Sequence, residues 1–114
     1  MNWEEIRMMN SNVKNINAAQ AKELINENNE VLILDVRNKD EFDRGHIPGA
    51  ILMPYSILPV RIHELEKYKD KPILVYCASG GRSPSAVQTL MYNDFSEIYH
   101  LTRGISSWTY EIQR

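Results

Sequence analysis

The pattern of hydrophobic positions divides the chain into short apolar runs separated by helical periodicities. Two of the runs, residues 31–34 and 73–76, are continuous and do not alternate with polar residues. Continuous runs of this kind are typical of strands that are covered on both faces, as in a parallel sheet. Residues 13–16, 50–53 and 98–101 are three further strand candidates. The pattern therefore predicts about five strands.

Two pairs of polar residues have the spacing of a capping box at the start of a helix. Asn17 is followed three residues later by Gln20, and Asn38 by Glu41. In a capping box the first side chain bonds a backbone N–H of the helix, and the later side chain bonds back. We expect helices that begin after these residues and extend to about residue 28 and residue 44.

The clearest helical pattern covers residues 83–93. Ser83 fits the N-cap position, and Pro84 fits the first helical position, where its missing N–H group costs nothing. Residues 61–68 and 105–112 are two weaker helix candidates.

Strands that alternate with helices predict an α/β fold, with a parallel sheet of about five strands flanked by helices on both faces. Ligands of such sheets bind beyond the carboxyl ends of the strands. Asp35 and Cys77 each follow a continuous apolar run, so both are expected at that edge. Residues 13–114 form the predicted domain, and residues 1–12 form an N-terminal extension for which a short helix and a frayed tail fit equally well.

Composition narrows the class of protein. The chain has 114 residues, of which 43% are hydrophobic and 25% charged, with a formal net charge of −2. These values suit one soluble domain, and they argue against disorder and against a basic surface for nucleic acid. The N-terminus lacks a signal-peptide pattern, and the nearly apolar stretch 50–60 is interrupted and too short to span a bilayer. We therefore expect a cytoplasmic protein with neither a membrane nor a nucleic acid as partner.

Cys77 is the single cysteine of the chain, so no intramolecular disulfide can form. A lone cysteine is either a small buried hydrophobic residue or a nucleophile. Its neighbours favour the nucleophile, because the loop from Cys77 to Pro84 connects a strand end to a helix start. Glycines at 80 and 81 allow the loop to curl into an anion-binding nest, and Arg82 adds positive charge. Such surroundings stabilise a thiolate. The predicted anion-binding residues are Ala78, Ser79, Gly80, Gly81, Arg82 and Ser83.

Residues 75–83 resemble the active-site loop of rhodanese-like proteins. Two flanking stretches agree with this resemblance: residues 34–50, which contain Asp35, Arg37 and a Gly-His-Ile-Pro-Gly-Ala segment, and residues 101–108. The resemblance covers residues 13–113. One departure is Arg103, since many relatives have Gly-Gly where this chain has Arg103 and Gly104. Arg103 could add charge at the mouth of the site or point into solvent.

The resemblance implies a sulfurtransferase without a cofactor. In such proteins a cysteine at the position of Cys77 accepts sulfane sulfur from thiosulfate or a persulfide, and passes it to a thiol or cyanide. The loop amides of residues 78–83 correspond to those that hold the persulfide, and Arg82 corresponds to the loop arginine of single-domain members. The acceptor is a small thiol or a protein, and the sequence identifies neither the physiological donor and acceptor nor the oligomeric state.

Two other functions share this loop. A sulfur carrier or regulatory binding module would use the same cysteine with little turnover. Phosphatases of similar fold have five residues between the cysteine and the arginine, whereas four separate Cys77 from Arg82. The shorter loop favours sulfur over the larger phosphate group.

The remaining candidates are given structural roles. Asp35 and Arg37 are expected to support the site or to brace it through ion pairs, for example Arg37 with Glu41. His46 is expected to fix a turn, and Trp108 to lie in the core. His63 and His100 are isolated in sequence, so no metal site is expected.

Overall fold

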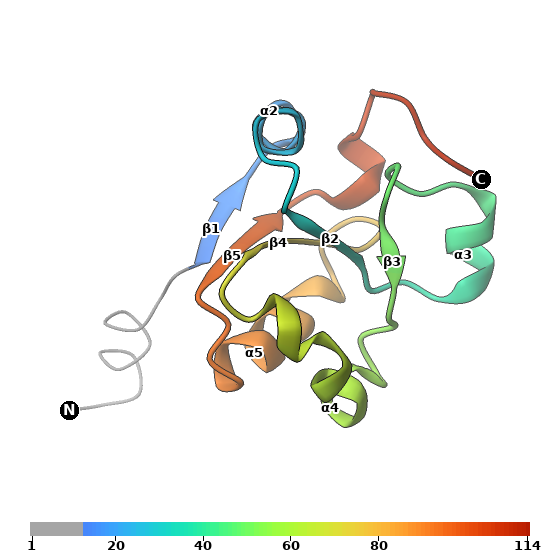
Figure 1. The fold of residues 1–114 in the computed structure, drawn as a ribbon. Coiled ribbons are helices and arrows are strands. Elements are labelled where there is room, and N and C mark those ends of the chain that lie inside the picture. The colour runs from blue at the N-terminus through green and yellow to red at the C-terminus, as the bar shows by residue number, and fades with distance from the viewer. Residues whose placement is uncertain (1–12) are drawn as a thin grey trace.

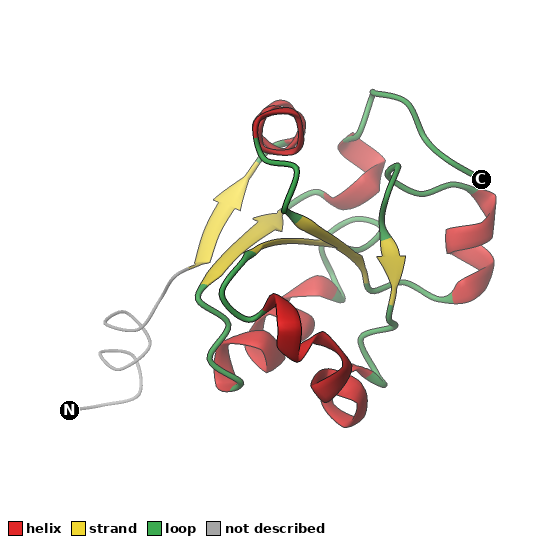
Figure 2. Ribbon diagram, viewed as in Figure 1, coloured by secondary structure: helices red, strands yellow, loops and turns green. Residues whose placement is uncertain are grey.

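The computed structural model describes residues 13–114, and the predicted N-terminal extension lies outside them. It is an α/β structure built on a parallel sheet of five strands, as predicted, and the strand order is β1-β5-β4-β2-β3 (Figures 1 and 2). The strands are β1 (Val13–Ile16), β2 (Leu32–Asp35), β3 (Ile51–Leu52), β4 (Pro72–Tyr76) and β5 (Glu97–Leu101). The α-helices are α2 (Ala18–Glu27), α3 (Lys39–Arg44), α4 (Leu58–Arg61) and α5 (Ser83–Tyr92). Two 3₁₀ helices are η1 (Ile62–Tyr68) and η2 (Gly104–Ser107).

The two continuous apolar runs form the centre of the sheet. Every residue of β2 and β4 is buried, and the strands pair in register with Leu34 opposite Val75. Their hydrophobic side chains contact helices on both faces, which explains why the runs do not alternate. Strand β3 is shorter than the predicted 50–53, because the Ala50 N–H bonds the Ile47 carbonyl in the preceding turn.

Helices cover both faces of the sheet, as Figure 1 shows, with α4 and α5 on one side and α2 on the other. The first core layer lies on the α5 side; its fully buried side chains include Leu34, Val75, Ala86, Leu90 and Ile98. The second layer is on the α2 side and includes Ala21, Ile33, Leu74, Leu101 and Trp108. Trp108 is 8% exposed, which confirms its prediction as a core residue.

Both predicted capping boxes are present. The Asn17 side chain accepts a bond of 2.8 Å from the Gln20 N–H, and the Asn38 side chain accepts one of 2.9 Å from the Glu41 N–H. In each box the later side chain also bonds the backbone N–H of the capping asparagine. The helices end at Glu27 and Arg44, within a residue of the predicted ends.

The prediction of Ser83 as an N-cap is wrong. Ser83 is the first residue of α5, and Arg82 occupies the cap position without a side-chain bond to the helix. The Ser83 hydroxyl lies instead against Cys77 and His100. A serine before a helix can bond elsewhere when the tertiary structure offers closer partners.

Two other helix predictions also need correction. Residues 61–68 form mainly the 3₁₀ helix η1, which follows the short helix α4. Residues 105–112 do not form a helix beyond η2, and the chain continues without regular secondary structure to a pair of backbone bonds between His46 and Gln113. The Trp108 indole N–H bonds the Glu111 carbonyl at 2.9 Å, which holds this segment against the core.

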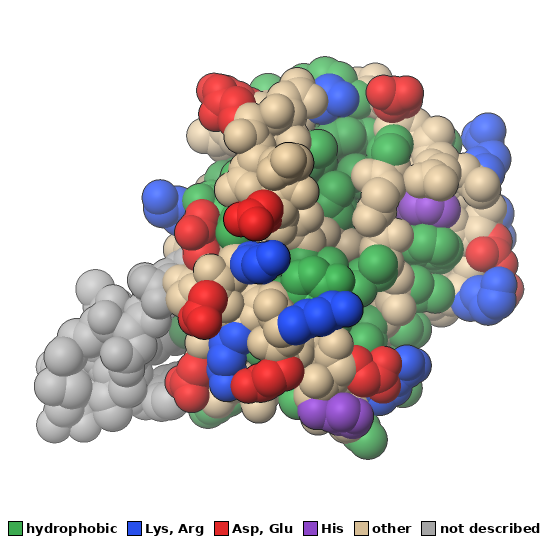
Figure 3. All heavy atoms as spheres, in the orientation of Figure 1, with side chains coloured by type: hydrophobic (Ala, Val, Ile, Leu, Met, Phe, Trp, Pro, Cys, Tyr) green, Lys and Arg blue, Asp and Glu red, His purple; other side chains and the backbone are tan. Residues whose placement is uncertain are grey.

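Acidic and basic side chains are intermixed on the face drawn in Figure 3, which agrees with the small net charge. Across residues 13–114, no helix combines the length and the apolar character needed to cross a membrane.

Candidate functional site

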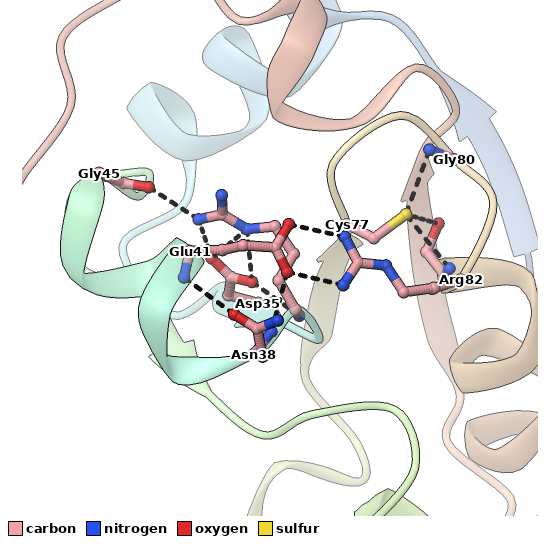
Figure 4. Close-up of polar contacts among 9 residues, drawn as sticks. Asp35, Asn38, Glu41, Gly45, Cys77, Gly80 and Arg82 are labelled. Atoms are coloured by element: carbon pink, nitrogen blue, oxygen red, sulfur yellow. Dashed lines mark hydrogen bonds and ion pairs between the residues drawn. The ribbon is translucent and has the colours of Figure 1, made fainter.

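Cys77 directly follows β4 and lies at the carboxyl edge of the sheet, beside the end of β2. The side chain is completely buried. The next five residues form a loop that returns the chain to the start of α5 (Figure 4). This is the position at which parallel sheets bind ligands. The loop contains five of the six predicted anion-binding residues, and the sixth, Ser83, is the first residue of α5.

The sulfur of Cys77 lies at the centre of this loop. The N–H of Gly80 donates a bond of 3.1 Å to Sγ, and the N–H of Ser83 donates one of 3.3 Å. The Ser83 Oγ lies 3.3 Å from Sγ. Backbone N–H groups that converge on one atom make a nest for an anion.

These contacts change the acidity of the thiol. Burial by itself would raise the pKa of Cys77. Bonds from the Ser83 hydroxyl and from the N–H groups of Arg82, Ser83 and Gly80 outweigh burial, so the pKa lies below that of an ordinary thiol. The site therefore favours the thiolate, which is the nucleophilic form of cysteine.

The two loop glycines differ in what the structure demands of them. Gly80 has φ +98°, and a Cβ there would collide with the Thr102 carbonyl oxygen. Gly81 has neither a positive φ nor an atom within 4 Å of a Cβ. Of the two glycines, only Gly80 is required for the loop conformation. The expectation that the loop requires both glycines is therefore wrong.

A second backbone segment, in η2, holds the loop through hydrogen bonds. The N–H groups of Ile105 and Ser106 each donate a bond of 2.9 Å, to the carbonyl oxygens of Cys77 and Ala78. Gly104 allows this approach, because it has φ +62° and a Cβ there would collide with the same two residues. Arg103, the residue before Gly104, is exposed.

Arg82 forms a double ion pair with Glu41 of α3. The guanidinium nitrogens lie 2.7 and 2.8 Å from the two carboxylate oxygens, across 41 residues of sequence (Figure 4). The positive charge of Arg82 is therefore shared with a carboxylate, which the sequence does not predict. The expected pair between Arg37 and Glu41 is wrong.

Arg37 pairs with Asp35 instead. Its Nη2 lies 2.7 Å from Asp35 Oδ2 and donates another bond of 2.7 Å to the Gly45 carbonyl. Both side chains are buried, at 6% and 0% exposed. The pair therefore connects the end of β2 to the C-terminal end of α3, beside the site.

Two of the three histidines, His46 and His100, have defined partners, and only His100 departs from the expectation. His46 stacks on Phe42 at 3.7 Å and bonds its carbonyl through Nδ1, in agreement with a structural role. His100 is not isolated: it is buried, and its Nε2 lies 2.6 Å from Ser83 Oγ. His100 lies two residues after Ile98 in β5, so both side chains are on the strand face toward α5. This spacing is the signal in the sequence that could have indicated the contact.

A cleft of about 430 Å³ lies between α3 and the C-terminal segment. Its lining combines apolar side chains with cationic and anionic groups. The lining residues are Arg37, Glu41, Arg44, Gly45, Ile105, Trp108 and Ile112. Glu41 lines the cleft and also pairs with Arg82, so the cleft adjoins the cysteine loop. Within the described range, no three side chains of the metal-binding types cluster together.

We expect Glu41→Gln to lower the free energy of unfolding by about 1–2 kcal/mol at neutral pH, because it leaves Arg82 without its partner. The Arg82 pair lowers the pKa of Glu41 from 4.5 to about 2. Its stabilising effect is therefore complete above pH 4.5 and is lost as the pH falls through 2. Denaturant unfolding of both proteins from pH 7 to pH 2 should show two curves that converge in acid.

The matched control is Asp43→Asn, which removes the exposed pair between Asp43 and Lys39 on the same helix. An exposed pair contributes under about 0.5 kcal/mol, so little change is expected. Equal losses in the two variants would contradict a special role for the Glu41 pair.

Comparison with known proteins gives a consistent result. The family model described as "Rhodanese-like domain" matches residues 17–111. The chain is 36% identical over 106 residues to the uncharacterized protein YibN of Escherichia coli, which covers 92% of this chain and 73% of that protein. It is 34% identical to the thiosulfate sulfurtransferase GlpE of Coxiella burnetii, over 83% of this chain and 86% of that protein.

The fold also matches solved structures. A rhodanese-related protein of Thermoplasma volcanium superimposes with a TM-score of 0.77 at 35% sequence identity, over 88% of this chain and 97% of that one.

Proposed function

The chain belongs to the rhodanese-like domain family, and we propose from this that it is a sulfurtransferase that carries sulfane sulfur on Cys77. The donor is thiosulfate or a persulfide, and the acceptor is a thiol, on a small molecule or a protein, or cyanide. One observation supports the proposal most directly: the Cys77 sulfur accepts bonds from two loop N–H groups and lies against the Ser83 hydroxyl.

The proposed transfer has two balanced steps. In the first, the Cys77 thiolate attacks the outer sulfur of thiosulfate, the S–S bond breaks, and sulfite leaves with the electron pair. In the second, an acceptor thiolate or cyanide attacks the outer sulfur of the persulfide, and the Cys77 thiolate leaves. The loop N–H groups suit both states, because each places negative charge on sulfur inside the nest.

The size of the loop supports sulfur over phosphate as the transferred group. Four residues separate Cys77 from Arg82, and the Arg82 guanidinium is held by Glu41. A phosphate monoester would need a wider loop and a free cation for its oxygens. A single added sulfur atom needs neither.

The test is to incubate the purified protein with thiosulfate and to measure its mass. A gain of one sulfur atom is expected, followed by its loss when cyanide or a small thiol is added, with thiocyanate or a persulfide as product. The same preparation should not hydrolyse a phosphate ester.

The outcomes separate the possible functions. Repeated turnover supports the enzyme, whereas loading that no small acceptor releases would indicate a sulfur carrier for a protein partner. No gain of sulfur from thiosulfate or from a persulfide donor would reject the proposal.

A further inference from the structure

His100 is a buried titratable side chain behind Cys77, and the proposed transfer gives it no role. It lies on β5 and is 8% exposed. Its Nε2 is 2.6 Å from Ser83 Oγ, which is 3.3 Å from Cys77 Sγ. The three side chains form a continuous chain of contacts from the sheet to the sulfur.

The other ring nitrogen fixes the direction of these contacts. Nδ1 of His100 lies 3.2 Å from the side-chain oxygen of Asn15 in β1. A carbonyl oxygen only accepts, so Nδ1 carries a hydrogen and, in the neutral ring, Nε2 does not. The Ser83 hydroxyl then donates to Nε2, and its oxygen is free to accept from the Cys77 thiol. In the thiol form, all bonds run in one direction from Cys77 to Asn15.

This direction determines where the proton goes when Cys77 ionises. A thiolate accepts only, so the Ser83 hydroxyl must donate to sulfur, and Nε2 must then donate to Ser83. We propose that His100 receives, through Ser83, the proton that Cys77 loses. The S–H bond breaks as its hydrogen binds Ser83 Oγ, and the original Ser83 O–H breaks as its hydrogen binds Nε2.

The products are a thiolate and an imidazolium, and no electron or proton is exchanged with solvent. Since the persulfide is also an anion, the imidazolium can remain while sulfur is carried. This inference rests on the proposed function, because it explains how the sulfur that performs the transfer becomes ionised.

Among residues 13–114, the contacts of His100 lead to one group that can carry a charge, the sulfur of Cys77. The neighbours on this face are Ser83 of α5, Asn15 of β1 and Val75, which is opposite it in β4. On the opposite face, Lys14 of β1 lies over the ring of Tyr99. The nearby loop cation, Arg82, is paired with Glu41. Burial lowers the pKa of His100, so the ring alone is neutral, and the thiolate of Cys77 is what would offset the cost of a buried imidazolium.

The experiment measures the pKa of Cys77 from the ultraviolet absorbance of its thiolate, with Cys77→Ser as the blank. Because the chain has a single cysteine, the difference reports on that residue alone. His100→Gln keeps a side chain that can bond Ser83 but cannot accept a proton, and we expect it to raise the pKa of Cys77 by about one unit or more. Ser83→Ala should also raise it.

The double variant tests whether the two residues act in one chain. Adding His100→Gln to Ser83→Ala should cause a smaller rise than His100→Gln causes in the wild type, because the Ser83 hydroxyl that couples the ring to the sulfur is already absent. His63→Gln, an exposed position in η1, is the matched control and should leave the pKa unchanged. An unchanged pKa in His100→Gln, or fully additive shifts in the double variant, would overturn the relay.

Nitrogen NMR of the His100 ring provides a second readout that does not depend on substitution at His100. The ring should be protonated at neutral pH when Cys77 is a thiolate, and neutral in Cys77→Ser. A neutral ring in both proteins would also overturn the relay.

Sulfur loading is measured in parallel. Loading of the wild type without a pKa shift in the variants rejects the relay alone, and a pKa shift without loading rejects the sulfurtransferase alone.

Discussion

Cys77→Ser is expected to abolish both the gain of sulfur from thiosulfate and its transfer to an acceptor, by a factor of about a thousand or more. A serine hydroxyl stays protonated at neutral pH, even where N–H groups would favour an anion, and its oxygen does not form a stable bond to sulfane sulfur. Mass measurement after incubation with thiosulfate, and an assay of thiocyanate formation, would show the loss.

The fold should tolerate this change, which makes the result interpretable. Serine is slightly smaller than cysteine and can still accept bonds from the Gly80 and Ser83 N–H groups. We expect a loss of unfolding free energy of about 1–2 kcal/mol, mainly from placing a hydroxyl in a buried position. Sulfur transfer at the wild-type rate in a folded Cys77→Ser protein would rule out the proposed function.

Gly80→Ala is expected to have the largest effect on the loop. The new Cβ would meet the Thr102 carbonyl oxygen, and φ +98° is strained for alanine. The loop must shift, and the bond of 3.1 Å from the Gly80 N–H to the sulfur is then lost. We expect a loss of about 2–4 kcal/mol in unfolding free energy and a raised pKa of Cys77.

Gly81→Ala is the matched control, one residue further along the same loop. A Cβ there has no atom within 4 Å, and the residue is exposed. Alanine should change the stability by less than about 1 kcal/mol and leave sulfur loading close to that of the wild type. Similar losses in the two variants would show that the loop does not depend on the conformation of Gly80. Thermal unfolding and the thiolate absorbance provide the two measurements.

The fold was predictable because its signals are local. Continuous apolar runs marked β2 and β4, and the asparagine caps marked the starts of α2 and α3. The errors occur where a distant partner determines the local structure. The C-terminal segment has helical spacing, yet it forms no helix beyond η2, and Gln113 pairs with His46 instead. The two residues of β3 follow a turn whose hydrogen bond removes Ala50 from the ladder.

In the site, too, local features were predicted and contacts between distant residues were missed. The loop around Cys77 was identified from consecutive residues, because the strand end, the glycines and the helix start are adjacent in sequence. The partner of Arg82 was not identified from the sequence, because Glu41 lies 41 residues away. The contact of Ser83 with His100, which lies 17 residues away, was not identified either. Contacts between distant residues depend on strand order, which hydrophobic periodicity does not specify.

The strand order has a consequence for how the protein is made. Strand β1 pairs with β5, and Val13 lies opposite Ile98. Strand β1 therefore cannot pair until a segment 85 residues later has been synthesised. Strands β2 and β4 are closer in sequence and can pair before β5 leaves the ribosome. A high sequence separation of contacts slows folding and leaves the early strand unpaired during synthesis. The nascent chain therefore has an unpaired β1 until β5 has been synthesised, and only then can Asn15 contact His100.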